Sequence, residues 1–267
     1  MDRITSRQNR VVKSTRLLRT RKGRLKEEKV LLEGVRLVSD ALLAGNLQFY
    51  WALGTETFWT DSEYEQLSGQ LQERCPCYVV SDDLLKDIAD TQHPQGIVSV
   101  VGAFDHDLTC CLDANPLILV ADQVADPGNA GTLVRTAAAA AASGVIFTRG
   151  SVDLFNPKCL RASMGAVFRV PVCQEVFPEQ LVGFLRKNGV RLYGAAGQAD
   201  LDYTQADFSN GMALAVGSEA FGLSPALEEA IEERLAIPMA NGVESLNVGV
   251  AAGVLLYEAH RQRYCKA

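Results

Sequence analysis

Apolar and polar positions alternate along the first hundred residues in the way expected of strands followed by helices. Four short apolar runs predict strands: KVLLEG, LQFYWALGT, CYVVS and GIVSVVGAF. Helical periodicity occupies the segments between them. One predicted helix ends at Gly45, a residue type favoured at helix C-termini, and another is capped by Ser81 with acidic residues in its first turn. This alternation predicts a compact α/β domain over residues 1–103.

The alternation breaks at residues 104–116, where mixed polar residues end in Pro116, and we interpret this stretch as a linker. From Leu117 the pattern restarts with LILVADQV. A continuous apolar run of this kind is typical of a strand buried on both faces of a parallel sheet. Residues 117–267 are therefore predicted to form a second α/β domain with a mostly parallel sheet.

The second domain continues the alternation to the end of the chain. Helices are expected at 129–143, around NPKCLRAS, at 178–188, after Pro225 and at 245–264, and strands at VIFT, VFRVPV, VRLYGAA, MALAVGS and LAIPM. Ligands of open parallel sheets bind beyond the carboxyl ends of the strands. Three loops rich in Gly, Asn and Ser leave such ends: DQVADPGNAG, VGSEAFGLS and IPMANGVESLN. These loops are the expected site.

Composition narrows the class of protein. The chain has 267 residues, 48% hydrophobic and 22% charged, as in ordinary globular proteins. No apolar stretch reaches the roughly 18 residues of a membrane helix, and MDRITSRQNR lacks the apolar core of a secretory signal. The seven cysteines are expected to be free thiols, and their spacing suits no zinc site. A cytoplasmic protein without membrane or metal is predicted.

Charge is distributed unevenly along the chain. Residues 1–36 hold twelve of the 26 Lys and Arg but four of the 32 Asp and Glu, so this segment carries +8 and the remainder −14. Beneath the charge lies a weak apolar stripe that includes Val12 and Leu18. A solvated amphipathic helix is one interpretation, and contact with nucleic-acid phosphates is the one we favour. The predicted RNA-binding residues are Arg7, Arg10, Lys13, Arg19, Arg21, Lys22 and Arg24.

The alanine-rich stretch NAGTLVRTAAAAAASG contains Arg135, four residues after Gly131. Burying an arginine for stability alone is costly, so a polar or anionic ligand is expected to approach it. The chain has neither G-x-G-x-x-G after a strand nor G-x-x-x-x-G-K-[ST], so a nicotinamide or nucleoside-triphosphate enzyme is poorly supported.

Three segments, NAGTLVRTA, LAVGSEAFGLS and IPMANGVESLNVGVAAGVLLYEAHRQR, resemble in order and spacing the three motifs of the SpoU (TrmH-type) RNA ribose 2′-O-methyltransferases of the SPOUT class. The resemblance covers 117–264. In addition, ITSRQNRVVKS, KVLLEGVRLVSDAL and HPQGIVSVV resemble the family's N-terminal substrate-binding domain. The resemblance implies a deep trefoil knot, a homodimer through the C-terminal domain, S-adenosylmethionine as methyl donor and an RNA ribose as acceptor.

The resemblance also implies roles for individual residues. The cofactor-binding positions are Gly217, Ile237, Leu246, Gly197 and Met239. The catalytic set is Arg135, Asn129, Glu219, Ser245 and Asn247. A guanidinium keeps its proton at neutral pH, so we expect Arg135 to clamp the adjacent phosphate and the attacking oxygen, while phosphate or water takes the proton.

Structural alternatives stay open for this set. Arg135 is alternatively a surface residue or a partner of Glu219. Asn129 and Ser245 are alternatively helix caps, and Glu219 an exposed turn residue. Asn247 is less easily explained by helix propensity, which favours a function.

The leading hypothesis is a ribose 2′-O-methyltransferase of structured RNA. Ribosomal RNA is favoured over transfer RNA because, in the family that the chain resembles, a full N-terminal domain accompanies ribosomal RNA enzymes more often. The alternatives are a tRNA 2′-O-methyltransferase, an RNA-binding or ribosome assembly factor of the same fold without catalysis, and a small-molecule methyltransferase. The last leaves the basic segment unexplained.

Overall fold

The computed structural model describes residues 1–196, 199, 201–218 and 221–264. The chain divides into two compact units. Unit 1 comprises Met1–Phe104 and Phe155–Phe168, and unit 2 comprises Asp105–Leu154 and the chain from Arg169 onward. A short segment from the middle of the chain therefore packs with the N-terminal unit, although its neighbours in the sequence on both sides belong to unit 2.

Unit 1 is built on a mixed sheet. Its elements are β1 (Asp2–Ile4), α1 (Arg10–Leu17), α2 (Arg21–Glu27), β2 (Lys29–Glu33), α3 (Val35–Ala44), β3 (Phe49–Thr55), α4 (Glu56–Thr60), η1 (Ser62–Tyr64), α5 (Glu65–Arg74), β4 (Cys77–Val80), α6 (Asp82–Ile88), β5 (Ile97–Gly102), α8 (Pro157–Ser163) and η3 (Ala166–Phe168). Among the described residues, five strands pair in the order β1-β4-β3-β5-β2. Only the pairings of β5 are antiparallel.

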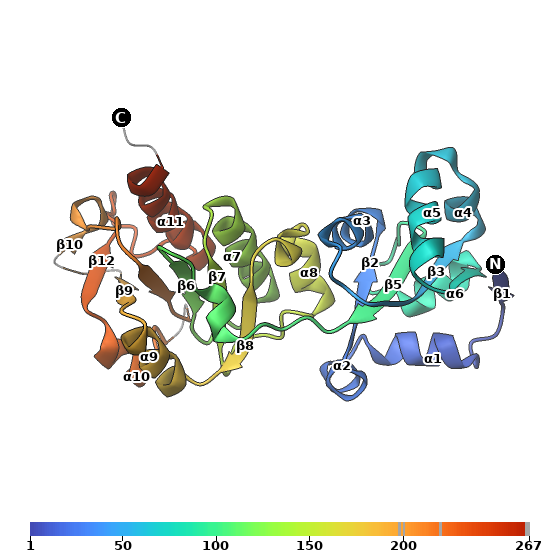
Figure 1. The fold of residues 1–267 in the computed structure, drawn as a ribbon, viewed down its shortest axis with the longest axis horizontal. Helices are drawn as coiled ribbons and strands as arrows, with labels where there is room; N and C mark the ends of the chain where they lie inside the picture. Colours follow the sequence, from blue (N-terminus) through green and yellow to red (C-terminus); the bar gives the residue numbers. More distant parts are fainter. Residues whose placement is uncertain (197–198, 200, 219–220, 265–267) are drawn as a thin grey trace. The chain divides into compact units, whose positions relative to one another are not determined.

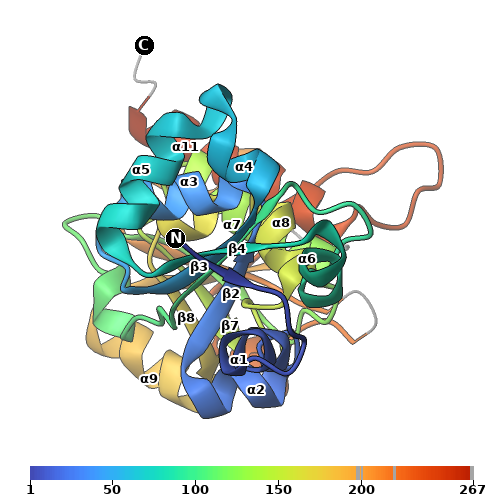
Figure 2. The same ribbon diagram turned by 90° about the vertical axis from the view of Figure 1, so that its right-hand side faces the viewer.

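Helices cover both faces of this sheet (Figure 2). α1 and α6 bury apolar residues, among them Val12 and Leu85, against strand residues such as Leu53 and Val98. α3 and α5 cover the opposite face. The four strands predicted for residues 1–103 are confirmed as β2, β3, β4 and β5. The short β1 and α4 carried no sequence signal that we recognised.

The basic segment, expected as one helix, forms two. α1 ends at Leu17, and the Thr20 side chain caps α2 by accepting a hydrogen bond from the backbone N–H of Gly23 at 3.1 Å. A Cβ atom at position 23 would lie 1.9 Å from the Leu17 carbonyl oxygen. The chain therefore turns sharply here because glycine permits an approach that no other residue allows.

Unit 2 is built on a parallel sheet. Its elements are η2 (Leu108–Cys111), β6 (Leu117–Ala121), α7 (Pro127–Ala139), β7 (Gly144–Thr148), β8 (Val172–Val176), α9 (Pro178–Lys187), β9 (Arg191–Ala196), β10 (Leu201–Asp202), η4 (Tyr203–Gln205), β11 (Met212–Val216), α10 (Pro225–Ala230), β12 (Glu233–Ala236) and α11 (Val248–Tyr264). Within the described ranges, seven strands run in the order β10-β12-β9-β11-β6-β7-β8, and every neighbouring pair is parallel. The predicted α/β fold with a parallel sheet is confirmed.

In Figure 1, α7 and α11 lie together on one face of this sheet, and α9 and α10 lie on the other. The strands are apolar on both faces, as the run LILVA indicated. Ile118 and Val120 of β6 pack toward α9 and α10, whose Leu181 and Leu227 are fully buried. α7 and α11 approach closely, since a Cβ at Gly249 would lie 2.9 Å from Thr132 Cγ2.

Several predicted elements of unit 2 have different boundaries, and the strand expected at LAIPM is found as β12 at Glu233–Ala236. The alanine-rich helix begins at Pro127 and ends at Ala139, because Asp126 caps its start and Ala141 adopts a left-handed φ of 57° that turns the chain into β7. The strand expected at VFRVPV begins only at Val172. Pro171 lacks the N–H that strand pairing requires, so regular pairing with β7 starts after it.

Candidate functional site

A cavity of about 210 Å³ lies where β9, β11 and β12 end. Its walls come from these three strand ends and from the start of α11, and the lining residues are Ala195, Ala196, Gly217, Ser218, Gly222, Leu223, Leu235, Ile237, Met239, Ser245, Leu246, Val248 and Ala251. Four of the five predicted cofactor positions are among them. Gly197, the fifth, lies outside the described residues.

The turn after β11 is shaped by two glycines. Ser218 and Gly222 exchange backbone hydrogen bonds of 3.0 and 2.9 Å, which closes the turn on itself. A Cβ at Gly217 would lie 2.3 Å from the backbone of Gly222, and Gly222 has a φ of +70°. Glycine is required at both positions, and the closed turn brings backbone atoms to the cavity wall. Glu219 lies outside the described residues.

A second, larger cavity of about 1040 Å³ follows β12 and the loop after it. Ile237 and Met239 line both cavities, so the two spaces share a wall. Arg234, Val243 and Glu244 lie around the larger one. Together the cavities offer a small apolar slot beside a wider polar opening.

A pair of asparagines joins the starts of α7 and α11. The Asn247 side chain donates a hydrogen bond to Asn129 Oδ1 at 2.9 Å, and its own Oδ1 accepts from the backbone N–H of Gly249 at 3.0 Å. Asn247 is therefore the residue that caps α11, and the helix begins at Val248 and not at 245. Ser245 is exposed and lines the cavity. α7 is capped by Asp126, whose Oδ1 accepts from the Asn129 N–H at 2.8 Å.

Arg135 lies on the exposed face of α7. Within residues 1–196, 199, 201–218 and 221–264, it has no hydrogen bond or ion pair, and it lines neither of the two cavities. The strand-end loops after β11 and β12 thus meet at one cavity. The loop after β6 joins them through the Asn129–Asn247 hydrogen bond.

Sequence reasoning missed Asp122, the residue directly after β6. Its side chain is completely buried, and it accepts hydrogen bonds from Thr148 Oγ1 and from the backbone N–H of Ser224, each at 2.5 Å. The carboxylate therefore ties the segment after the β11 turn to the ends of β6 and β7. An aspartate at the end of a wholly apolar strand was the available signal.

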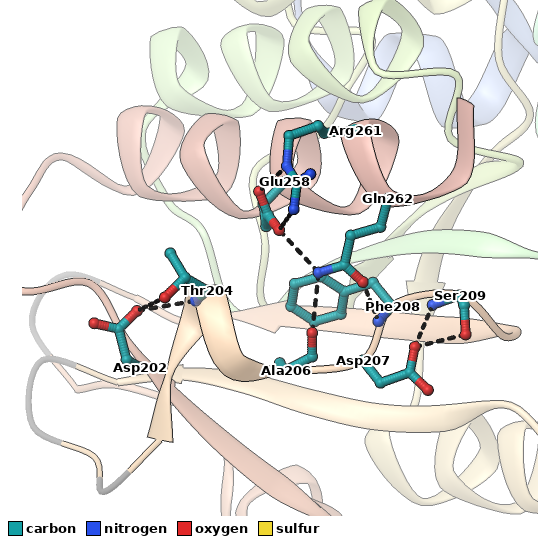
Figure 3. Close-up of polar contacts among 9 residues, drawn as sticks. All are labelled: Asp202, Thr204, Ala206, Asp207, Phe208, Ser209, Glu258, Arg261 and Gln262. Carbon is teal, nitrogen blue, oxygen red and sulfur yellow. Dashed lines mark hydrogen bonds and ion pairs between the residues drawn. The ribbon is translucent and has the colours of Figure 1, made fainter. Parts of the chain in front are cut away.

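The last turns of α11 are anchored to the segment before β11 (Figure 3). The Gln262 side chain donates to the Ala206 carbonyl at 3.0 Å and accepts from the Phe208 N–H at 2.8 Å. Glu258 receives hydrogen bonds from Arg261 and Gln262. The hydrogen bond from Arg261 holds the pKa of the Glu258 carboxyl below its ordinary value.

The basic surface of unit 1 consists of the predicted RNA-binding cations that are exposed on the first two helices and in the turns next to them: Arg7, Arg10, Lys13, Arg19, Arg21 and Lys22. Lys26 of α2 is exposed as well. Arg7, Arg16 and Arg19 contact Asp87 at the end of α6. Arg24, predicted to bind RNA with the others, is only 5% exposed and donates to the Leu18 carbonyl at 2.7 Å. It faces the protein because it holds the end of α1 against α2.

Two further findings concern the chain as described. No helix of residues 1–196, 199, 201–218 and 221–264 combines the length and apolar character needed to cross a membrane. The same residues contain no group of three or more His, Cys, Asp or Glu side chains arranged to hold a metal ion. The six described cysteines are free thiols.

A parallel sheet with a cavity at the carboxyl ends of its strands is the arrangement in which α/β proteins bind small ligands. Residues 116–257 match the SpoU rRNA Methylase family, and residues 9–99 match the MRM3-like substrate binding domain. The chain belongs to the SpoU rRNA methylase family, as its sequence motifs indicated.

Individual relatives cover almost the whole chain. It is 35% identical to the 23S rRNA (guanosine(2553)-2'-O)-methyltransferase RlmP of Bacillus subtilis over 96% of this chain and 98% of the relative. Among solved structures, an AdoMet-bound rRNA methyltransferase from Sinorhizobium meliloti has a TM-score of 0.87 and 29% identity, covering 97% of both chains. The AdoMet complex of AviRb from Streptomyces viridochromogenes has a TM-score of 0.87 and 27% identity, covering 96% of this chain and 98% of that one.

Proposed function

We propose that this protein transfers a methyl group from S-adenosylmethionine to a ribose 2′-hydroxyl of structured RNA, and that the RNA is ribosomal. The observation that carries the proposal is the cavity that gathers Gly217, Ile237, Met239 and Leu246 at the strand ends. The relative from B. subtilis is named as a 23S rRNA 2′-O-methyltransferase, and two similar structures contain AdoMet.

The cavity residues suit this cofactor. Small and aliphatic side chains, such as Ala195, Leu223 and Leu235, leave a slot for a flat purine ring, and the strand ends offer backbone N–H and C=O groups to its edge. The adjoining polar cavity has room for an amino-acid group. When bound, the cofactor supplies a methyl group already activated by its sulfonium, so the proposed reaction needs no metal.

Arg135 is proposed to position the acceptor. Its guanidinium stays protonated, so it is suited to hold the phosphate next to the target ribose and the attacking oxygen, and unsuited to remove a proton. We assign that proton to the phosphate or to water. Asn129, Ser245 and Asn247 are proposed to orient the loops and the ribose, and Glu219 and Gly197 keep their proposed catalytic and cofactor roles.

A homodimer would complete this site. Arg135 does not line the cavities of its own chain, in the part of the chain that the structure describes, so we propose that it reaches the cavity of a second copy. A surface for that copy exists on α11, where Val250, Tyr257 and Tyr264 recur every seven residues and are each more than 50% exposed. This spacing places them on one face of the helix.

We also propose the trefoil knot that the resemblance implies. β12 lies beyond β9 in the sheet, whereas α11 packs on α7 and β11. The segment between Ala236 and Val248 therefore returns across the strand ends, a course compatible with threading.

The basic surface of unit 1 is proposed to hold the RNA by its phosphates. Exposed cations attract any RNA backbone, so this surface supplies affinity more than sequence choice. We further propose a cytoplasmic location, which fits free thiols and a ribosomal substrate.

The test combines calorimetry with methyl transfer. Purified protein should bind S-adenosylmethionine, and with tritiated cofactor it should label ribosomal RNA from cells lacking the protein, at a ribose 2′-oxygen. Cofactor binding without label in any RNA would contradict the proposed activity. RNA binding without cofactor binding would instead support an assembly factor that has lost catalysis, and label in tRNA alone would overturn the choice of substrate.

A further inference from the structure

Unit 1 contains a cavity of its own, of about 440 Å³, which the proposed reaction does not use. It lies between the start of α3, the segment after α6 and the helix α8. The residues that matter for its chemistry are Gly34, Leu37, His93, Gln95, Leu160 and Arg161. All of them belong to unit 1.

A buried carboxylate fixes the segment that forms one wall. Glu33, at the end of β2, is 8% exposed and accepts hydrogen bonds from the backbone N–H groups of Asp90 and Thr91 at 2.7 and 3.2 Å. The Thr91 hydroxyl donates to the same carboxylate. A carboxylate that satisfies two backbone N–H groups holds its loop in place, so the wall is preformed.

Arg161 of α8 lines the cavity with its guanidinium. It donates from Nη2 to Asp90 at 2.8 Å, while its Nη1 is buried, makes no hydrogen bond among the described residues and lies 4.0 Å from Glu33 Oε2. A buried N–H without a hydrogen-bond acceptor is unfavourable, and an acceptor on a ligand that reaches this group would relieve it.

The start of α3 lies at the same cavity. Gly34 has a φ of +93°, and a Cβ there would lie 2.8 Å from Gln95 Oε1, so the glutamine side chain reaches close to this backbone. No side chain caps α3, and Arg36 and Leu37 of its first turn line the cavity together with Gly34.

The charges favour a neutral ring over a bare anion. Arg36 has Asp40 at 4.0 Å and Arg161 has Asp90 at 2.8 Å, so both guanidinium groups at the cavity already have carboxylate partners. Leu37 and Leu160 supply apolar surface between them. Apolar walls with a few converging donors and acceptors, at this volume, are typical of small-ligand pockets.

We propose that this cavity takes one unpaired nucleobase of the RNA substrate. The inference rests on the proposed function. Proteins read single-stranded RNA by splaying bases out, stacking them on side-chain planes and bonding their edges. Here Leu37 and Leu160 border the ring, while the Arg161 guanidinium, Gln95 and His93 bond its edge. The cavity would thereby recognise a particular base, whereas the basic surface binds RNA phosphates regardless of sequence.

The test pairs protein variants with RNA variants. The double variant His93→Ala/Gln95→Ala removes two exposed groups from the rim, and Gln92→Ala, an exposed neighbour outside the cavity lining, is the matched control. In a fragment around the methylated nucleotide, single positions are replaced in turn by abasic residues. At one position the abasic RNA should raise the KM of the wild type about tenfold, with kcat within twofold.

The double variant should show the same raised KM with intact RNA and no further loss with that abasic RNA, while its thermal unfolding and cofactor binding stay as in the wild type. Gln92→Ala should behave as the wild type does. An unchanged KM in the double variant, or additive losses, would overturn the inference although the wild type still methylates RNA. Sensitivity to phosphate substitution alone would point to backbone contact and also overturn it. A wild type that methylates no RNA would instead defeat the proposed function itself.

Discussion

Unit 1 spreads seven exposed cations, Lys26 included, over two short helices and the turns next to them, whereas unit 2 carries Arg135 as the only charged residue of the thirteen-residue α7. The short helices rest on a few buried residues such as Val12 and Leu18. α7 is held between the sheet and α11, close enough that Gly249 admits no larger side chain without displacement. Under the proposed function, the charges of unit 1 would act by their number and the single charge of α7 by its position.

Both units hold a loop with a buried carboxylate at a strand end. Glu33 of β2 binds the segment after α6, and Asp122 after β6 binds the segment after the β11 turn. In each case the loop borders a cavity. The units therefore differ in how they present charge. They share the use of a buried carboxylate to fix a loop that borders a cavity.

The largest effect is expected from Arg135→Ala. If this arginine works by position, its loss should lower kcat at least about 100-fold, the scale for removing one transition-state electrostatic contact. Cofactor affinity measured by calorimetry should stay near that of the wild type, because Arg135 lines neither cavity in the described chain. Arg186→Ala, an exposed arginine on α9, is the control and should keep full turnover. Equal losses of kcat in both variants would mean that Arg135 contributes only as one positive charge among others.

Asp122→Ala should have the next largest effect. It leaves the Ser224 N–H and the Thr148 hydroxyl without their acceptor in the core, which should lower the free energy of unfolding by about 3 kcal/mol in urea titrations. Cofactor binding should weaken as well, because the β11 turn loses its anchor. Asp113→Ala removes an exposed carboxylate that accepts from Asn115, and it should change little. Similar stability for the two variants would refute the anchoring role.

Neutralising Arg10, Lys13 and Lys22 together should act on affinity instead. Removing three phosphate contacts should weaken RNA binding about tenfold and flatten the plot of log affinity against log salt by about 2 units, while kcat at saturating RNA stays unchanged. The double neutralisation of Arg186 and Lys187 on α9 controls for net charge. An unchanged salt slope would remove the basic surface from RNA binding. Adding Arg24→Ala should lower the free energy of unfolding but should not flatten the salt dependence further, since Arg24 is buried.

Patterns that depend on local chemistry were predictable from the sequence. Apolar runs located the strands of both sheets except the short β1 and β10, and glycines after strand ends located the cavity. The features that could not be predicted depend on contacts between residues that are not neighbours in local structure or in sequence. Arg24 sits within a basic run, and only the turn at Gly23 buries it. The sequence alone suggests that Asp122 is a loop residue. Its structural role depends on the backbone N–H of Ser224, 102 positions later in the chain.

The same limit applies to the packing of residues 155–168 with unit 1. The helix NPKCLRAS was predicted and is confirmed as α8. Its partners were not predictable, because the ion pair of Arg161 with Asp90 joins residues 71 positions apart. Local propensity indicates that a segment is helical, and it carries no information about which sheet the helix covers.

The smallest expected effect concerns a charge whose role is structural, Glu258 on α11. The pKa of this carboxyl is lowered by its hydrogen bond from Arg261, so the folded state binds the proton less readily than the unfolded chain does. The stabilisation is therefore present above the unfolded pKa of about 4.3 and is lost as pH falls through the lower folded value. Glu258→Gln should cost about 0.5 kcal/mol near neutral pH, as expected for a partly exposed ion pair.

The measurement is urea unfolding of the wild type and Glu258→Gln between pH 7 and pH 3. The difference between them should be constant down to about pH 5 and then shrink toward zero. Asp202 and Asp207, whose pKa values are lowered by hydrogen bonds from Thr204 and Ser209, remain in both proteins, so their titration cancels from the comparison. A difference that grows on acidification would mean that the carboxyl is less acidic in the folded state. The hydrogen bond from Arg261 would then not be what stabilises the Glu258 carboxylate in the folded state.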